Sequence, residues 1–164
     1  MTLTVADGFP YYISLVEGLD YKKLFRSNDN FRVLSSISEG QSKLRYAEGK
    51  WSIRQLVGHM TDHERIMIYR ILRFSRKDNT LLSGYDQEIL VKNSRFDELT
   101  MKFLLNDFRT IRQATLNLIE SLSPEQMKLR GKAWKFELTV EEFLKATIGH
   151  EVHHMKVIKE RYLK

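Results

Sequence analysis

The chain contains no cysteine and only two prolines among its 164 residues. The lack of cysteine excludes a disulfide framework, a thiolate metal site and a thiol nucleophile. Eight glycines and two prolines are too few turn-forming residues for an all-β protein, and they favour long helices. There is no run of about 18 apolar residues, and no apolar segment follows Met1. We therefore expect no membrane span, no signal peptide and a cytoplasmic location.

The chain has enough apolar residues to form a packed core. Hydrophobic residues make up 42% of the sequence and charged residues 29%, which predicts one domain over residues 1–164. The net charge is +6, but basic and acidic residues alternate along the chain. The densest basic group lies in residues 65–77, where a solvated helix face is a better explanation than a nucleic-acid surface. We expect no nucleic-acid and no membrane partner.

Apolar residues recur at helical spacing in four long segments, which predicts an all-α four-helix bundle. Two of these segments begin with the pattern of a capping box, Ser52 with Gln55 and Thr139 with Glu142. The predicted helices are residues 20–38, 51–77, 98–122 and 139–163.

Several connecting segments carry their own signals. Residues 9–13 are rich in aromatic side chains and are expected to pack on the bundle. Residues 78–97 have no sustained helical face and are long for a connection, which indicates a crossover or a functional loop. Residues 131–137 are predicted to be a loop with an extended piece at 134–136. We expect 78–97 and 131–137 to form walls of a pocket.

All five histidines lie in the second and fourth predicted helices: His59, His63, His150, His153 and His154. Residues four apart share one helix face, so His150 and His154 have the spacing at which two imidazoles chelate a metal. His59 and His63 have the same spacing. Pairs of this kind also arise by chance on solvated helices, so the spacing alone leaves a metal site and surface histidines as alternatives.

A helical wheel places four of these side chains inward. His150 and His154 lie at the edge of the apolar face of their helix, His59 lies at the edge and His63 nearer the middle of theirs, and His153 points to solvent. Several buried neutral imidazoles are hard to satisfy without a metal or carboxylates.

The helix order decides whether the histidines meet. In antiparallel helices His59, His150 and His154 come level within about one turn. The long connection at 78–97 lets the second and third helices run the same way, so we expect long crossovers and an up-down-down-up order.

Glu151 lies in the apolar face of the fourth predicted helix. A buried carboxylate costs several kcal/mol unless it is paired, and His63 or Arg70 are candidate partners. In the alternative, Glu151 tilts outward at the edge of the bundle and pairs on the surface.

Two segments together resemble the DinB-like superfamily. Residues 51–59, WSIRQLVGH, are similar to the start of its second helix, and residues 149–154, GHEVHH, are similar to the signature of its last helix. Residues 69–70, 84–86 and 138–142 also fit, so the resemblance extends from Pro10 over essentially the rest of the chain. It implies a four-helix bundle and a divalent metal held by three histidines: here His59, His150 and His154.

The resemblance also implies a class of function. Zinc or nickel suits three imidazoles, and a three-histidine site leaves one coordination position open. The implied function is a metal-dependent enzyme acting on a small molecule, either a thiol S-transferase with a low-molecular-weight thiol as co-substrate or a hydrolase. Glu151, His63 and Glu64 are candidates for acid–base catalysis. The superfamily often forms dimers, which suggests a homodimer.

The alternative function is a non-catalytic bundle. Such a protein would bind a small molecule or a partner protein and keep a structural or vestigial metal. It predicts a coordination sphere closed by a fourth protein ligand such as His63.

Overall fold

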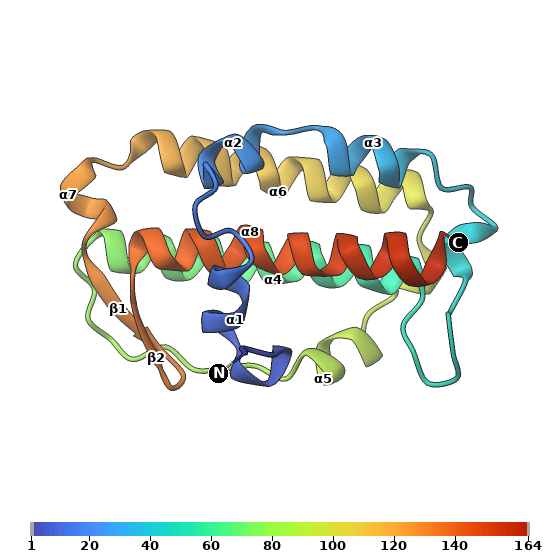
Figure 1. The fold of residues 1–164 in the computed structure, drawn as a ribbon, viewed down its shortest axis with the longest axis horizontal. Helices are drawn as coiled ribbons and strands as arrows, with labels where there is room; N and C mark the ends of the chain where they lie inside the picture. The colour runs from blue at the N-terminus through green and yellow to red at the C-terminus, as the bar shows by residue number, and fades with distance from the viewer. Residues whose placement is uncertain (1, 164) are drawn as a thin grey trace.

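The computed structural model describes residues 2–163 and is mostly helical. Three long helices form the body of the bundle, and two short ones lie along α6 (Figure 1). The chain colours of Figure 1 show that α4 and α8 lie side by side and run in opposite directions. The long helices are α4 (Ile53–Ser75), α6 (Met101–Ser121) and α8 (Val140–Val157), and the short ones are α2 (Tyr21–Arg26) and α3 (Asp29–Ser35).

The smaller elements lie at the ends and along one side of the bundle (Figure 1). They are η1 (Val5–Asp7), α1 (Phe9–Ser14), η2 (Gln41–Lys43), α5 (Gln87–Lys92), η3 (Phe96–Glu98), α7 (Pro124–Met127), β1 (Arg130–Ala133), β2 (Phe136–Thr139) and the π-helical η4 (Ile158–Tyr162). No helix within residues 2–163 is both long enough and apolar enough to cross a bilayer.

The starts of two long helices follow the capping pattern in the sequence. The Ser52 hydroxyl accepts a hydrogen bond from the Gln55 backbone N–H, and the Thr139 hydroxyl accepts one from that of Glu142. In both cases the side chain at the third position bonds back to the backbone of the cap residue, which completes a capping box. The predicted beginnings of these helices are confirmed to within two residues.

The prediction of one helix over residues 20–38 is wrong, because the helix is interrupted at Ser27. The backbone of Ser27 is extended, with ψ 139°, and its hydroxyl accepts a hydrogen bond from the Asp29 N–H at 3.1 Å. Serine side chains offer the backbone this alternative to continuing a helix. Phe25 and Phe31 are nevertheless both buried, so α2 and α3 present one apolar side to the bundle.

The all-α prediction is wrong at one place, where β1 and β2 form an antiparallel hairpin. The predicted extended piece at 134–136 is also misplaced, since residues 134–135 form the turn between the strands. Gly131 lies against the ring of Phe74, and a Cβ atom at Gly131 would come within 2.1 Å of that ring. Leu82 makes an isolated bridge to Ala133, which attaches the connection 78–97 to the hairpin. That connection also contains α5.

The aromatic segment at residues 9–13 packs on the bundle as predicted, and it does so as part of a helix. Figure 1 shows α1 crossing α8, and Phe9 packs against Phe136 and Phe143 with ring centroids 5.0 and 5.8 Å away. The crossing needs a glycine, because a Cβ atom at Gly149 would lie 2.0 Å from the Tyr12 carbonyl oxygen. The segment therefore covers the part of α8 that carries the histidines.

The apolar core is divided along the bundle by a belt of buried polar residues. One apolar cluster contains Met67 of α4 and Leu144 of α8, and the other contains Met60 of α4 and Met155 of α8. Between them lie buried polar side chains from three helices. These are His59, His63, Glu64, Arg112, Thr115, His150 and Glu151.

Candidate metal centre

Three histidines converge within this polar belt. The Nε2 atom of His150 lies 2.9 Å from Nε2 of His59 and 3.1 Å from Nε2 of His154. Among residues 2–163 these are the only three histidine or acidic side chains whose ligand atoms all lie within 4.8 Å of one another. The predicted convergence is present, because antiparallel α4 and α8 bring one turn of each helix to the same level. Their role as metal ligands stays a prediction.

Protons alone cannot satisfy this arrangement. A neutral imidazole nitrogen carries either one hydrogen or one lone pair. Nε2 of His150 faces two other ring nitrogens at hydrogen-bond distance, so it can form a well-directed bond with only one of them. A cation shared by three lone pairs would satisfy all three nitrogens at once, and imidazole is a good ligand for zinc and nickel. The donor set therefore fits a divalent metal.

Burial keeps these imidazoles neutral. It lowers the pKa of His59 from 6.5 to about 4. Burial also holds the pKa of His150 and of His154 well below the usual range, and repulsion from the neighbouring histidines adds to this effect. Neutral imidazole is the form that binds a metal.

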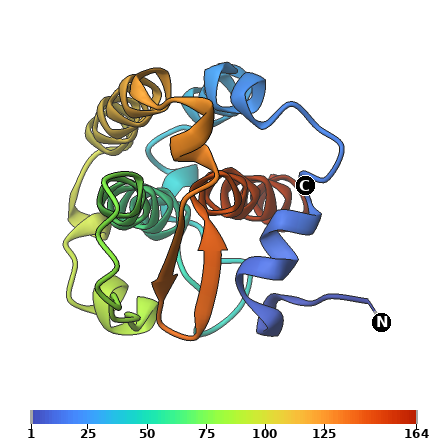
Figure 2. The ribbon, with the colours of Figure 1, turned by 90° about the vertical axis from the view of Figure 1, so that its left-hand side faces the viewer.

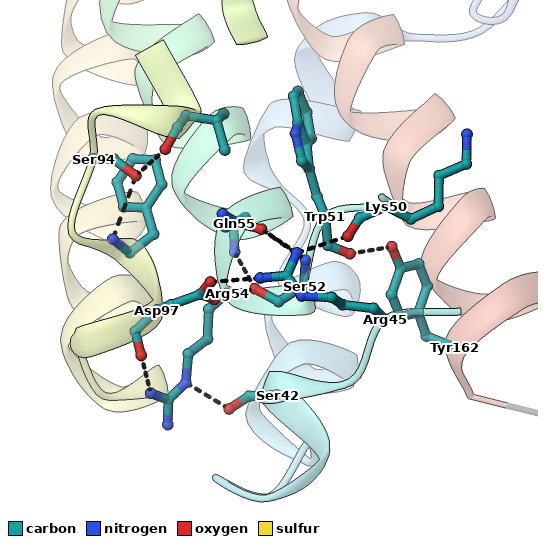
Figure 3. Close-up of polar contacts among 12 residues, drawn as sticks. Ser42, Arg45, Lys50, Trp51, Ser52, Arg54, Gln55, Ser94, Asp97 and Tyr162 are labelled. Carbon is teal, nitrogen blue, oxygen red and sulfur yellow. Dashed lines mark hydrogen bonds and ion pairs between the residues drawn. The ribbon is translucent and has the colours of Figure 1, made fainter. Parts of the chain in front are cut away.

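A network of polar contacts fixes the start of α4 and thereby the level of His59. The Arg54 guanidinium donates to the Ser42 hydroxyl at 2.8 Å and to the Asp97 carbonyl at 2.9 Å. The Tyr162 hydroxyl donates to the Trp51 carbonyl at 2.6 Å, which joins this end of α4 to η4 (Figure 3).

His63 lies beside the cluster without joining it. Its ring stacks on that of His150, with centroids 3.8 Å apart. Its Nδ1 is 2.6 Å from the Tyr85 hydroxyl, and its Nε2 is buried without a hydrogen-bond partner among residues 2–163. His63 does not belong to the group of three convergent ligand atoms, so the geometry does not favour it as a fourth ligand.

Both predictions for the environment of Glu151 are wrong. Its carboxylate is buried rather than turned outward, and it pairs with Arg112 of α6 rather than with His63 or Arg70. Asn30 also donates to it, at 2.7 Å.

The same arginine holds Glu64. Arg112 donates to the Glu64 carboxylate at 3.0 and 2.8 Å, and the Thr115 hydroxyl donates to it at 2.6 Å. These contacts with Glu64 and Glu151 do not favour acid–base roles, which stay predictions. Arg112 was missed in the sequence, although its spacing from Phe108 and Ile119 places it on the apolar face of α6.

The prediction that His153 points to solvent is wrong. Its side chain is half-buried, and Nδ1 lies 3.1 Å from the Tyr11 hydroxyl. The helical wheel treats α8 in isolation, whereas Tyr11 and Tyr12 of α1 pack against the His153 ring, with centroids 5.6 and 5.8 Å away.

Two cavities flank the histidine cluster. The larger, about 330 Å³, is lined by His63 and His150 together with Tyr12, Tyr85 and Trp134. Figure 2 shows the elements around it, with α1 on one side of the hairpin and α5 on the other. The second cavity, about 240 Å³, is lined by Lys50, Trp51, His153 and His154. The predicted pocket walls at 78–97 and 131–137 do line the larger cavity, through Tyr85 and Trp134.

Comparison with known proteins agrees with this architecture. The sequence profile of the DinB superfamily matches residues 26–158. No curated protein is significantly similar to the chain in sequence. Among solved structures, the chain is similar to YfiT from Bacillus subtilis, with a TM-score of 0.74 and 17% identity over 97% of this chain and 87% of that one. That protein is described as a probable metal-dependent hydrolase with an unusual four-helix bundle topology. The chain belongs to the DinB superfamily and has the fold of a four-helix bundle.

Proposed function

We propose that this chain is a metal-dependent enzyme that acts on small molecules, as a hydrolase or a thiol S-transferase. The observation that carries the proposal is the convergence of three neutral imidazole nitrogens that protons cannot satisfy, next to a cavity of about 330 Å³. The description of YfiT as a probable metal-dependent hydrolase supports the same class of chemistry on a shared fold.

His59, His150 and His154 would hold the metal, for which zinc or nickel is the expected ion. With three protein ligands, a divalent cation bound there would supply Lewis-acid chemistry at an open coordination position, toward either a water or a thiol.

We propose that the hydrogen-bonded pair of His63 and Tyr85 holds and transfers a proton beside the histidine cluster. Burial raises the pKa of Tyr85 to about 12 and lowers the pKa of His63 well below 6.5. The proton between them therefore stays on the tyrosine oxygen at neutral pH, and His63 keeps one ring nitrogen unprotonated. This makes His63 the best placed of the three predicted acid–base residues, whereas Arg112 holds the carboxylates of Glu64 and Glu151.

The proposal also includes the other expectations from the sequence. These are one domain over residues 1–164, an up-down-down-up helix order, a cytoplasmic location, a homodimer and a low-molecular-weight thiol as co-substrate if the reaction is a transfer. The central claim does not depend on these expectations. The three-histidine site needs the antiparallel pairing of α4 and α8, and the cavity beside it needs the walls that Tyr12, Tyr85 and Trp134 supply.

The metal site is tested by metal analysis of the purified protein. We expect about one zinc or nickel ion per chain, and almost none in a variant carrying His150→Ala and His154→Ala. The matched control is His153→Ala, which removes a neighbouring half-buried histidine that lies outside the cluster and should keep the metal. Full metal content in the double variant would disprove the site.

Turnover separates the enzyme from the non-catalytic alternative. The metal-loaded and the chelated protein are assayed with a panel of esters and amides, and with pairs of low-molecular-weight thiols and electrophiles. The proposal expects metal-dependent turnover of at least one class. A protein that holds its metal but turns over neither class would favour the binding bundle.

A further inference from the structure

Three arginines are buried in the bundle, and one of them differs from the other two. Arg112 is paired with two carboxylates, and Arg54 is paired with Glu39. Arg70 is only 4% exposed, yet no carboxylate of residues 2–163 lies within ion-pair distance of it. Burying a cation without a counter-ion costs several kcal/mol, so a fully buried arginine in a folded protein is usually paired with an anion.

The contacts of Arg70 leave its charge uncompensated. One guanidinium nitrogen donates to the Ser83 carbonyl at 2.8 Å, and another approaches the Met67 sulfur at 3.7 Å. The guanidinium also lies 5.6 Å from the centre of the Tyr85 ring. These partners are neutral, and a guanidinium stays protonated at neutral pH. Donor capacity and a full positive charge therefore remain available.

Arg70 lines the same cavity of about 330 Å³ as His63 and His150. The other walls are mainly apolar and aromatic, and they include Phe9, Tyr12, Tyr85, Trp134 and Phe136. No aspartate, glutamate or lysine is among the lining residues, so Arg70 supplies the only full charge of the cavity. The volume is at the lower end of the range for small-molecule sites, about 300–1,000 Å³.

We propose that Arg70 binds the carboxylate of the substrate, and that the substrate is a small monocarboxylate with an apolar or aromatic body. One guanidinium without a second cation matches one negative charge, and its planar fork suits a carboxylate. The aromatic walls match the apolar body, and the reacting group would lie toward His150. This assignment rests on the proposed function, because it makes this cavity the substrate site of the candidate metal centre.

The test compares two probes that differ in charge. Binding of 3-phenylpropanoate and of its neutral amide, 3-phenylpropanamide, is measured by calorimetry on the metal-loaded and on the chelated full-length protein. We expect the carboxylate to bind about 10- to 100-fold more tightly than the amide. If Arg70 binds the carboxylate, the preference for the carboxylate over the amide should persist after chelation. If only the metal binds the carboxylate, chelation should remove the preference.

Variants assign the preference to one residue. Arg70→Gln should abolish it, and Arg70→Lys should restore part of it, because the charge returns without the planar fork. Arg76→Gln, at the exposed residue that caps the C-terminus of α4, removes the same charge from the protein outside the cavity and should keep the full preference. Circular dichroism of each variant checks that it is folded.

Several outcomes would overturn the inference. Equal binding of the two probes to the wild-type protein contradicts it without reference to any variant. A preference that survives in Arg70→Gln contradicts the role of this residue, and tighter binding of phenyl phosphate contradicts a singly charged ligand group. If the protein holds metal but does not prefer the carboxylate to the amide, the result overturns this inference and leaves the proposed function intact. An Arg70-dependent preference in a protein that binds no metal overturns the proposed function alone.

Discussion

Two buried polar clusters lie next to each other in the middle of the bundle, and they differ in how completely their polar atoms find hydrogen-bond partners within the chain. In the cluster around Arg112, two carboxylates share one guanidinium, and Asn30 and Thr115 supply further hydrogen bonds. The cluster around His150 instead crowds three ring nitrogens together, and next to it Nε2 of His63 has no partner within residues 2–163.

The difference separates a structural cluster from a binding site. Buried polar groups are costly unless they are hydrogen-bonded, so a cluster completed by the chain itself needs nothing further. A cluster that the chain leaves incomplete gains stability when a ligand supplies the missing partner. By this criterion the Arg112 cluster holds α4, α6 and α8 together, whereas the histidine cluster and Arg70 are left incomplete by the chain, which is the basis of the two proposals above. His150 and Glu151 are adjacent in the chain, yet they serve different clusters.

The largest effect is expected from acid acting on the metal-free protein. Burial lowers the pKa of His59 from 6.5 to about 4, and the pKa values of His63, His150 and His154 are also lowered. Below pH 6.5 these histidines are therefore protonated in the unfolded chain while they remain neutral in the folded chain. Stability is fully present above pH 6.5 and falls as the pH drops, by about 1.4 kcal/mol per pH unit for each histidine that stays neutral.

Urea unfolding of the chelated protein between pH 7 and pH 5 measures this slope. A His59→Gln variant has one titrating histidine fewer, so it should lose about 2 kcal/mol less stability between pH 7 and pH 5, most of that difference arising below pH 6.5. A free energy of unfolding that stays constant over this range would mean that the histidine cluster is not buried as described. It would also contradict the contrast between this cluster and the Arg112 cluster.

The next largest effect is expected from breaking the completed cluster. Arg112→Met leaves Glu64 and Glu151 buried without their cation, which should destabilise the protein by about 3–5 kcal/mol. Adding Glu64→Gln and Glu151→Gln removes all three charges and should recover much of the loss.

The control for this prediction is Arg109→Met, on an exposed position of the same helix, which should cost less than about 1 kcal/mol. Chemical denaturation gives the stabilities, and metal analysis of the triple variant should still find the ion. An Arg112→Met variant as stable as the control would show that this cluster does not hold the helices together.

A smaller effect is expected at the cover of the histidine cluster. Gly149→Ala would place a Cβ atom 2.0 Å from the Tyr12 carbonyl oxygen, so α1 must move away from α8. We expect a loss of about 1–3 kcal/mol from this overpacking, reduced by the better helix propensity of alanine. Denaturation measures the loss, and binding of 3-phenylpropanoate should weaken because Tyr12 lines the cavity.

Gly40→Ala is the matched glycine control. Gly40 has φ −66° and its nearest neighbour would be 3.9 Å from the added Cβ atom, so this change should be neutral. Equal stability of the two variants would show that α1 is not seated against Gly149.

Much of the fold was predictable because the signals are local. Helical periodicity and the capping residues Ser52 and Thr139 depend on neighbours within a few positions, and they located the long helices. The break at Ser27 and the hairpin at 130–139 were missed. At Ser27 the alternative is a single side-chain hydrogen bond, and the hairpin depends on packing of Gly131 against the distant Phe74.

The candidate site divides in the same way. The spacing of His150 and His154, together with the family resemblance, identified the three convergent histidines. The partner of Glu151 was wrong, because Arg112 lies 39 positions away on another helix and meets it only through the rotation of α6 against α8. The packing of α1 on His153 was not predicted, because no residue pattern within α8 specifies where α1 packs against it.

By itself, the sequence determined where the long helices begin, which residues face inward and which imidazoles share a helix face, since these follow from local periodicity. Only the tertiary structure decided which inward polar groups find partners within residues 2–163 and which do not. That outcome depends on how the helices are rotated and spaced against one another. Packing of the whole core sets these quantities, and no single segment encodes them.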